Sequence, residues 1–209
     1  MLSRICSSLN KKDSKTTDKG IHRANDILKT ARTLFATEGY AGLSMRKVAS
    51  QLEISLSTVQ HYYKDKDTLL IAVIHDILDG NQDAINELLE KMPLSTQLEK
   101  LEEVIDFFLF SNLKPDVANV FMEIWSLANR NPLAKKIVTE AREREKKEVM
   151  RLIFGLIPEF EKKDYELRSS MFVSLIEGIS FAIHQAAPEA RAEIAKVGKQ
   201  NLLQLATSK

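Results

Sequence analysis

Residues 44–69 constrain the fold more than any other stretch, because they predict two short helices joined by a tight turn. Ser44 and Ser55 are typical N-cap residues, since a serine oxygen can accept a hydrogen bond from an amide two or three positions further on. Two short amphipathic helices can share one small core if their apolar positions align. The aligned apolar positions are Val48, Leu52, Ile54, Val59 and Tyr63.

The second of these helices carries a polar face without net charge. In a helix-turn-helix the second helix enters the major groove while the first crosses the DNA backbone. We expect Gln60 to bond an adenine edge bidentately, Arg46 to reach guanine or a phosphate, and Lys66 to add positive charge beside the backbone. The alternative is that this polar face is simply solvated. The candidate DNA-contacting residues are Ser44, Arg46, Ser55, Leu56, Ser57, Thr58, Gln60, His61, Tyr62 and Lys66.

A longer helix is predicted immediately before this pair. Ile27, Ala31, Leu34 and Phe35 recur at spacings of three and four residues and give the helix one apolar face. Gly39 is well placed to end this helix in the left-handed conformation, and we expect Tyr40 to pack in the turn that follows.

The segment from Ile27 to Leu70 resembles the amino-terminal domain of TetR-family transcriptional regulators. It reads ILKTARTLFATEGYAGLSMRKVASQLEISLSTVQHYYKDKDTLL, with an aromatic-glycine turn, a capped MRKVA helix, a capped recognition helix and an aromatic-Lys-x-Lys-x-x-Leu entry into a long helix. Three positions depart from the family pattern: Glu53 stands where glycine is usual, Gln60 where tyrosine is frequent, and Tyr63 where phenylalanine is common. Glu53 either places a carboxylate near DNA or faces solvent.

The charge distribution fits a basic DNA-binding head and a larger body. Residues 1–70 hold 12 Lys+Arg and 7 Asp+Glu, for a net charge of +5, whereas the rest of the 209-residue chain sums to −4. Neutralising backbone phosphates supplies much of the affinity for DNA. We expect a disordered polar arm over residues 1–20, a helix-turn-helix domain over 21–66 and an effector-binding and dimerisation domain over 67–209.

The amino-terminal arm bears on compartment and on DNA contact. It lacks the apolar core of a signal peptide, and no stretch approaches the roughly 20 apolar residues that span a bilayer, so we expect a soluble cytoplasmic protein. Its lysines either touch phosphates near the groove or belong to a solubilising tail. The single cysteine, Cys6, cannot form an internal disulfide and is consistent with a reducing compartment.

Beyond residue 65 the chain is predicted to be helical throughout, with prolines at the borders. Helices are expected over about 67–91, 94–112, 116–130, 133–155, 164–186 and 189–206, since proline is tolerated in a first turn or terminates the preceding helix. No strand alternation persists. The fold class is therefore all-α, with a three-helix head and about nine helices in total.

The body is rich in aromatic and soft side chains, and the resemblance implies that its centre holds a small effector. Aromatic residues at helical spacing also serve as ordinary core, and His184 in FAIHQAA suits a hydrogen-bonded interior position. A lining with few charges favours a hydrophobic or amphipathic molecule. The candidate pocket residues are Phe107, Phe108, Phe121, Met122, Trp125, Phe172 and His184.

The last two predicted helices carry apolar stripes, and Gly178 permits close approach of another backbone. Packing within one chain produces the same stripes, but the resemblance implies a four-helix dimer interface built from these two helices of each subunit. A two-fold protein presents two recognition helices to a palindromic operator. The candidate dimer residues are Phe172, Leu175, Ile176, Ile179, Ile183, Ile194, Val197 and Leu202.

Enzymatic function is not expected. The sequence contains no nucleophile elbow, phosphate-binding glycine loop or paired metal-ligand motif, so no catalytic residue, metal or cofactor is assigned. The mixed-charge run at 141–151 is predicted to be a solvated, ion-paired helix face. The favoured function is a homodimeric transcriptional repressor released from its operator by a small molecule; the alternative is an effector-independent architectural or cell-division DNA-binding protein of the same fold.

Overall fold

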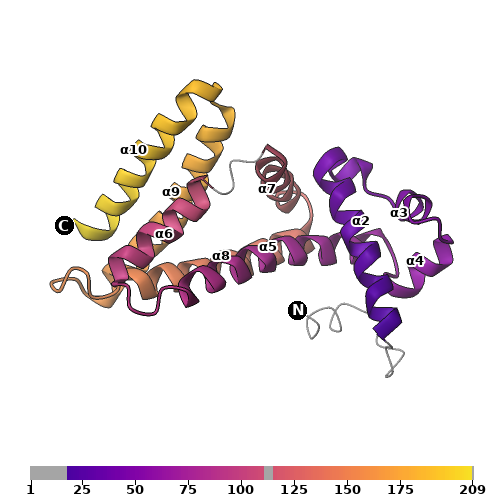
Figure 1. The fold of residues 1–209 in the computed structure, drawn as a ribbon, viewed down its shortest axis with the longest axis horizontal. Coiled ribbons are helices and arrows are strands. Elements are labelled where there is room, and N and C mark those ends of the chain that lie inside the picture. The colour runs from indigo at the N-terminus through magenta and orange to yellow at the C-terminus, as the bar shows by residue number, and fades with distance from the viewer. Residues whose placement is uncertain (1–17, 111–114, 209) are drawn as a thin grey trace. The chain divides into compact units, whose positions relative to one another are not determined.

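The chain is all-α, as predicted. The computed structural model describes residues 18–110 and 115–208, and within these ranges it contains nine helices and no strand (Figure 1). The helices are α2 (Asp18–Gly42), α3 (Met45–Gln51), α4 (Leu56–Tyr62), α5 (Lys66–Glu90), α6 (Gln97–Phe110), α7 (Pro115–Ala128), α8 (Pro132–Ile153), α9 (Lys162–Gln185) and α10 (Pro188–Thr207).

Proline sets several of these borders. Pro115, Pro132 and Pro188 are the first residues of α7, α8 and α10, where the missing amide hydrogen has no helical partner to lose. Pro93 and Pro158 lie in the connections before α6 and α9. The amino-terminal border differs from the prediction, because α2 begins at Asp18, inside the expected polar arm. Cys6, Lys11, Lys12 and Lys15 lie outside the described residues.

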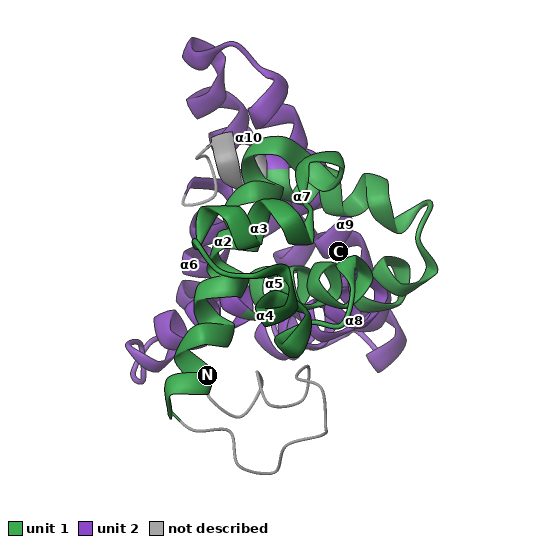
Figure 2. Cartoon of the chain, turned by 90° about the vertical axis from the view of Figure 1, so that its right-hand side faces the viewer, with its two compact units in different colours: residues 1–79, 120–137 green, residues 80–119, 138–209 purple. Residues whose placement is uncertain are grey.

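Two compact units divide the described chain, and Figure 2 colours them separately. The first unit combines the residues up to Asp79 with Val120–Ile137, and the second combines Gly80–Asn119 with residues 138–209. The predicted domains are continuous stretches that meet at residues 20 and 66, whereas each compact unit combines two separate stretches of chain. The predicted domain boundaries therefore stay predictions. None of the described helices joins the length and the apolar character that crossing a membrane requires.

The first unit has a core shared by α2, α3, α4 and the start of α5. The predicted apolar face of α2 is confirmed, since Ile27, Ala31, Leu34 and Phe35 are all buried. Val48, Val59 and Tyr63 are also buried, whereas Leu52 and Ile54 are half-buried. The Tyr63 hydroxyl donates to the carbonyl of Ala24 at 3.4 Å, which joins the end of the α3–α4 pair to α2.

The second unit is built on a core drawn from the end of α5 and from α6, α8, α9 and α10. Ile105, Leu109, Ile153, Phe172 and Leu202 are among its fully covered side chains. The hydroxyl of Tyr165 donates to the carbonyl of Ile157 at 2.6 Å and accepts from its amide at 3.2 Å, which fixes the connection between α8 and α9.

Helices α9 and α10 form a hairpin in this unit and pack closely (Figure 1). A Cβ atom placed on Gly198 of α10 would lie 2.6 Å from the side chain of Ile179 on α9. Only glycine therefore lets the two helices approach this closely.

Candidate nucleic-acid interface

Both short helices of the α3–α4 pair begin at a serine cap, as predicted. Ser44 has an extended backbone and its hydroxyl accepts from the Lys47 amide at 3.1 Å. Ser55 is also extended, and its hydroxyl accepts from the Thr58 amide at 3.1 Å. Each cap satisfies an amide that has no partner in the first helical turn. These bonds define where α4 starts and therefore which side chains it exposes.

The turn between α3 and α4 places Glu53 in the left-handed region, with φ of +53°. Its amide donates to the carbonyl of Ser50 at 3.2 Å, and the following amide of Ile54 donates to Ala49 at 3.0 Å. This conformation costs an L-residue about 1–2 kcal/mol, which explains why glycine suits the position. The Glu53 side chain is exposed, so a carboxylate stands beside the first turn of α4.

The exposed face of α4 is short, polar and uncharged. Ser57, Gln60 and His61 are exposed, while Leu56, Thr58 and Tyr62 are half-buried. The hydroxyls of Ser57 and Thr58 both lie 2.8 Å from that of Ser55, so the amino-terminal end of α4 presents a hydrogen-bonded group of three hydroxyls. The amide of Gln60 carries both a donor and an acceptor, which matches the edge of adenine.

Two cations beside α4 face different surroundings. Arg46 is exposed near the start of α3. Lys66 is half-buried, donates to the carbonyl of Tyr40 at 2.8 Å and lies 3.8 Å from the centre of the Tyr40 ring. Burial lowers the pKa of Lys66. Lys66 thus joins the start of α5 to the last residues of α2, and its predicted contact with DNA stays a prediction.

Lys64 is a candidate phosphate contact that the sequence interpretation missed. It lies two residues after the end of α4, is exposed, and stands between the buried Tyr63 and the exposed Asp65. Asp65 caps α5 through bonds from the amide and hydroxyl of Thr68 at 2.8 and 2.7 Å, which lowers the pKa of Asp65. The Lys-x-Lys pattern at 64–66 was the sequence signal for this residue. Lys66 packs against Tyr40, so Lys64 is the lysine of the pair that extends into solvent.

The candidate effector residues are distributed over both units. Phe121, Met122 and Trp125 are half-buried on the part of α7 in the first unit, and the rings of Phe121 and Trp125 lie 6.4 Å apart. Phe107, Phe108, Phe172 and His184 belong to the second unit. Phe172 is fully buried in the helical core, whereas Nε2 of His184 lies 3.2 Å from Oδ1 of Asn119.

The candidate dimer residues separate into two groups. Phe172, Ile176, Ile183 and Leu202 are buried in the core of their own chain and have little surface left for a partner. Leu175, Ile179 and Ile194 are half-buried, and Val197 is exposed.

The exposed apolar residues of α9 lie on its other side. Leu167, Met171 and Phe181 are exposed by 65%, 53% and 49%. Together with Ser174 and Gly178 they recur at alternating spacings of four and three residues, the heptad pattern of helices that pack along a seam. These five residues form the α9 seam, which carries no charged residue. Their spacing could be read from the sequence, but the predicted dimer stripe lay mainly on the buried side of the helix.

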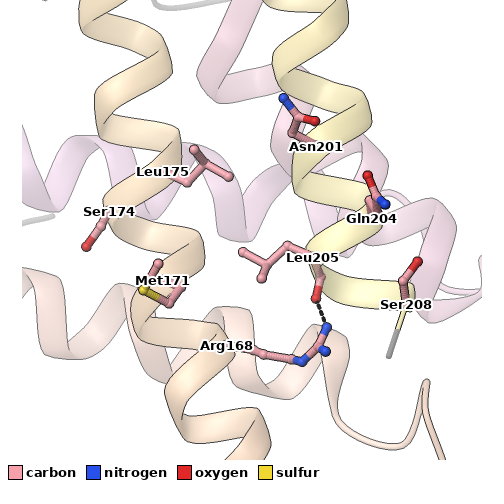
Figure 3. A pocket seen from close by; sticks show the side chains of 8 residues that line it. All are labelled: Arg168, Met171, Ser174, Leu175, Asn201, Gln204, Leu205 and Ser208. Atoms are coloured by element: carbon pink, nitrogen blue, oxygen red, sulfur yellow. Dashed lines mark hydrogen bonds between the residues drawn. The ribbon is translucent and has the colours of Figure 1, made fainter.

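A groove of about 580 Å³ lies between α9 and α10 on this side (Figure 3). Asn201 and Gln204 of α10 are exposed along it, and Arg168 donates to the carbonyl of Leu205 at its floor. The remaining lining residues are Met171, Ser174, Leu175, Leu205 and Ser208. The α9 seam therefore continues across a groove that is polar on the α10 side.

The mixed-charge run on α8 is not uniformly solvated. Glu145 is half-buried and falls four residues after the buried Ala141 and four before the buried Val149. Burial, with a smaller contribution from the charge of Glu177 on α9, raises the pKa of Glu145 to about 7. Arg142 pairs with Glu177 at 3.0 Å. Because Glu145 lies four residues from both Ala141 and Val149, it shares their buried side of α8, and its carboxylate turns inward.

Replacing Glu145 by glutamine should stabilise the protein increasingly as pH rises. The native carboxyl keeps its proton up to about pH 7, whereas the unfolded chain loses it near 4.5, so wild-type stability falls through that window and stays low above it. With the partial exposure discounted, we expect a gain of about 1–2 kcal/mol at pH 8. Urea denaturation between pH 5 and pH 8 measures it. Glu143→Gln on the exposed face of α8 is the control, and equal pH profiles for the two variants would contradict the assignment.

The described residues offer no group of three His, Cys, Asp or Glu side chains arranged to hold a metal ion. The arrangement that does stand out is the pair of capped helices, whose second member exposes donors and acceptors between Arg46 and Lys64. Such a surface can contact base edges and phosphates.

Comparison with known proteins places this arrangement among bacterial regulators. Residues 27–73 match the family of bacterial regulatory proteins known as the tetR family. The chain is 37% identical over 109 residues to the uncharacterised HTH-type transcriptional regulator in the dhlA 5′ region of Xanthobacter autotrophicus. That match covers 50% of this chain and 52% of that protein, so it spans about half the length of the relative.

Solved structures share the fold over most of the chain. A TetR transcription regulator from Haloarcula marismortui superposes with a TM-score of 0.72 at 22% identity, covering 88% of this chain and 96% of that one. A protein from Saccharomonospora viridis, described as a transcriptional regulator and crystallised with choline, gives a TM-score of 0.71 at 20% identity, covering 87% and 93%. At these identities the likeness concerns the fold.

Proposed function

We propose that this chain, which belongs to the TetR family of bacterial regulatory proteins, is a homodimeric repressor released from a palindromic operator by a small effector. The observation that carries the proposal is the α3–α4 pair: two serine-capped helices, the second of which exposes an uncharged face of donors and acceptors. In a helix-turn-helix this face lies in the major groove.

Base recognition is assigned to α4 and backbone contact to the residues around it. Gln60 projects from the exposed face, where its amide can form two bonds to adenine. Arg46 and Lys64 lie on either side of α4 in sequence and are exposed, which suits contacts to phosphate. Glu53 opposes them with a negative charge near the first turn of α4, so it disfavours sequence-independent binding.

Gln60→Ala and Lys64→Gln should weaken binding in different ways. Loss of the Gln60 amide should cost about 1–3 kcal/mol at one base position and relax preference there. Loss of the Lys64 charge should weaken all sequences alike and reduce the salt slope by about one. Gel shifts with an operator and its single-base variants at two salt concentrations measure both effects. An unchanged base preference in Gln60→Ala would remove Gln60 from base readout.

Dimerisation is supported by the α9 seam and the groove beside it. Leu167, Met171 and Phe181 expose apolar surface to water on a charge-free helical face. This exposure is unfavourable in an isolated chain and is relieved when a partner covers the face. A Cβ atom on Gly178, in the middle of this seam, would meet nothing within 4 Å in the single chain. A second copy is the occupant that we propose. Two α9 seams can pack against each other, and with the α10 helix beside each of them they form a four-helix interface.

A small organic effector is supported by the half-buried aromatic residues of the body and by the fold neighbour from Saccharomonospora viridis, which was crystallised with choline. We propose a hydrophobic or amphipathic molecule. It would release the operator by binding more tightly to a conformer in which the two α4 helices are wrongly spaced.

A further inference from the structure

Residues 39–43, where α2 kinks and then ends before α3, form the α2–α3 turn. This turn is held by a residue more than eighty positions away. Gly39 interrupts the helical conformation of α2 with φ of +66° and ψ of −168°, a combination essentially restricted to glycine. This differs from the left-handed helix end expected from the sequence, although the positive φ is as predicted. The ψ of Gly39 sets the direction of the next amide, that of Tyr40, which donates to Oε1 of Glu123 on α7 at 2.8 Å.

The Glu123 carboxylate also occupies the space where a side chain at position 39 would begin. A Cβ atom on Gly39 would lie 3.0 Å from Oε1 and 3.3 Å from Cδ of Glu123. The backbone conformation restricts this position to glycine, and a Cβ there would also push the carboxylate away by a few tenths of an ångström. Ile124, the next residue of α7, is fully buried, so the helix that carries Glu123 is anchored in the same compact unit.

Tyr40 links Glu123 to Lys66 at the start of α5. Its amide is bound by Glu123, its carbonyl accepts from Nζ of Lys66 at 2.8 Å, and its ring lies under the same ammonium group. The carbonyl of Gly39 accepts from the amide of Leu43 at 3.2 Å, which leads directly to the Ser44 cap of α3. One carboxylate on α7 therefore meets the turn from which both α3 and α5 are positioned.

We propose that Glu123 is a positioning residue through which α7 controls the α2–α3 turn and, with it, the orientation of the α3–α4 pair. Its regulatory meaning rests on the proposed function, because α7 also carries Phe121, Met122 and Trp125, the candidate effector residues of this unit. Movement of α7 withdraws the carboxylate from the Tyr40 amide. A buried or half-buried amide without an acceptor is unfavourable, so the turn changes conformation with α7.

Amide hydrogen exchange at Tyr40 in the full chain tests this without DNA. Glu123→Ala should raise the exchange rate of that amide about tenfold or more, and Glu123→Asp, which is one methylene shorter, should do the same. Glu123→Gln keeps an acceptor at the same reach and should preserve protection. Ser126→Ala, an exposed change on the same helix, is the control. Equal protection in Glu123→Ala and wild type would overturn the proposal.

Coupling to α7 is tested by a double-mutant cycle with Trp125→Ala. This change should alter Tyr40 exchange in the wild-type background and have little effect when Glu123 is alanine or aspartate. Equal effects of Trp125→Ala in all backgrounds would show that α7 reaches the turn by another route. With an operator duplex, Glu123→Ala should bind about fivefold more weakly or worse and Glu123→Gln within about twofold of wild type. Failure of wild type to bind any duplex contradicts the proposed function, while the exchange results still decide on Glu123.

Discussion

Replacing Phe172 by alanine is expected to lower the free energy of unfolding by about 3–5 kcal/mol. Phe172 is only 1% exposed and lies in the core formed by the end of α5 and by α6, α8, α9 and α10. The loss combines the transfer of a large apolar side chain with the cavity that close-packed neighbours cannot fill. From its sequence position, Phe172 was predicted to line both the effector pocket and the dimer interface. A loss of stability of this size would show that the side chain mainly packs in the core of its own chain.

The control is Phe110→Ala, because Phe110 is 45% exposed at the end of α6. We expect it to cost about 1 kcal/mol or less, since much of its surface is already in water. Denaturation is compared at one fixed protein concentration, because dissociation of a dimer would otherwise shift the apparent stability. Similar losses in the two variants would contradict the core assignment of Phe172.

Gly178→Arg is expected to convert the protein from dimer to monomer. A side chain at Gly178 meets nothing within 4 Å in the single chain, so the fold tolerates it, whereas an arginine in the centre of the proposed α9 seam blocks a second copy and adds a buried like charge. The measured mass in solution should fall to the 23.7 kDa of one chain. Operator affinity should fall by about 100-fold or more, because the second half-site is no longer bound by the same complex.

Gly80→Arg is the matched control for this change. Gly80 is likewise an exposed glycine inside a helix, α5, and a Cβ atom there also meets nothing within 4 Å, but it lies outside the α9 seam. It should keep the mass of a dimer and the affinity of wild type. A dimer formed by Gly178→Arg would place the interface elsewhere, and a monomeric wild type would contradict the proposed homodimer.

Local features of this fold were predictable from sequence because they depend on neighbouring residues. The serine caps of α3 and α4 bind amides three positions on, and the first residues of α7, α8 and α10 are prolines. The apolar spacing of Ile27, Ala31, Leu34 and Phe35 determines one face of α2 without reference to the rest of the chain.

Features that depend on distant partners were not predictable in the same way. Lys66 bonds the Tyr40 carbonyl across 26 positions, and Glu123 bonds the Tyr40 amide across 83, so neither contact leaves a periodic pattern. Helix α9 carries two apolar stripes, and periodicity alone does not tell which one packs in the chain. Burial of Phe172, Ile176 and Ile183 decides it, and Leu167, Met171 and Phe181 stay exposed.

Selection of bound duplexes from a random DNA pool by the purified wild-type protein tests operator binding by a homodimer without any variant. We expect enrichment of an inverted repeat whose half-site centres lie about 10 base pairs, or a multiple of that, apart. Binding of the enriched duplex should weaken steeply as salt rises, because phosphate contacts release counterions. Recovery of a pool without any shared or palindromic sequence would contradict sequence-specific operator binding by a homodimer.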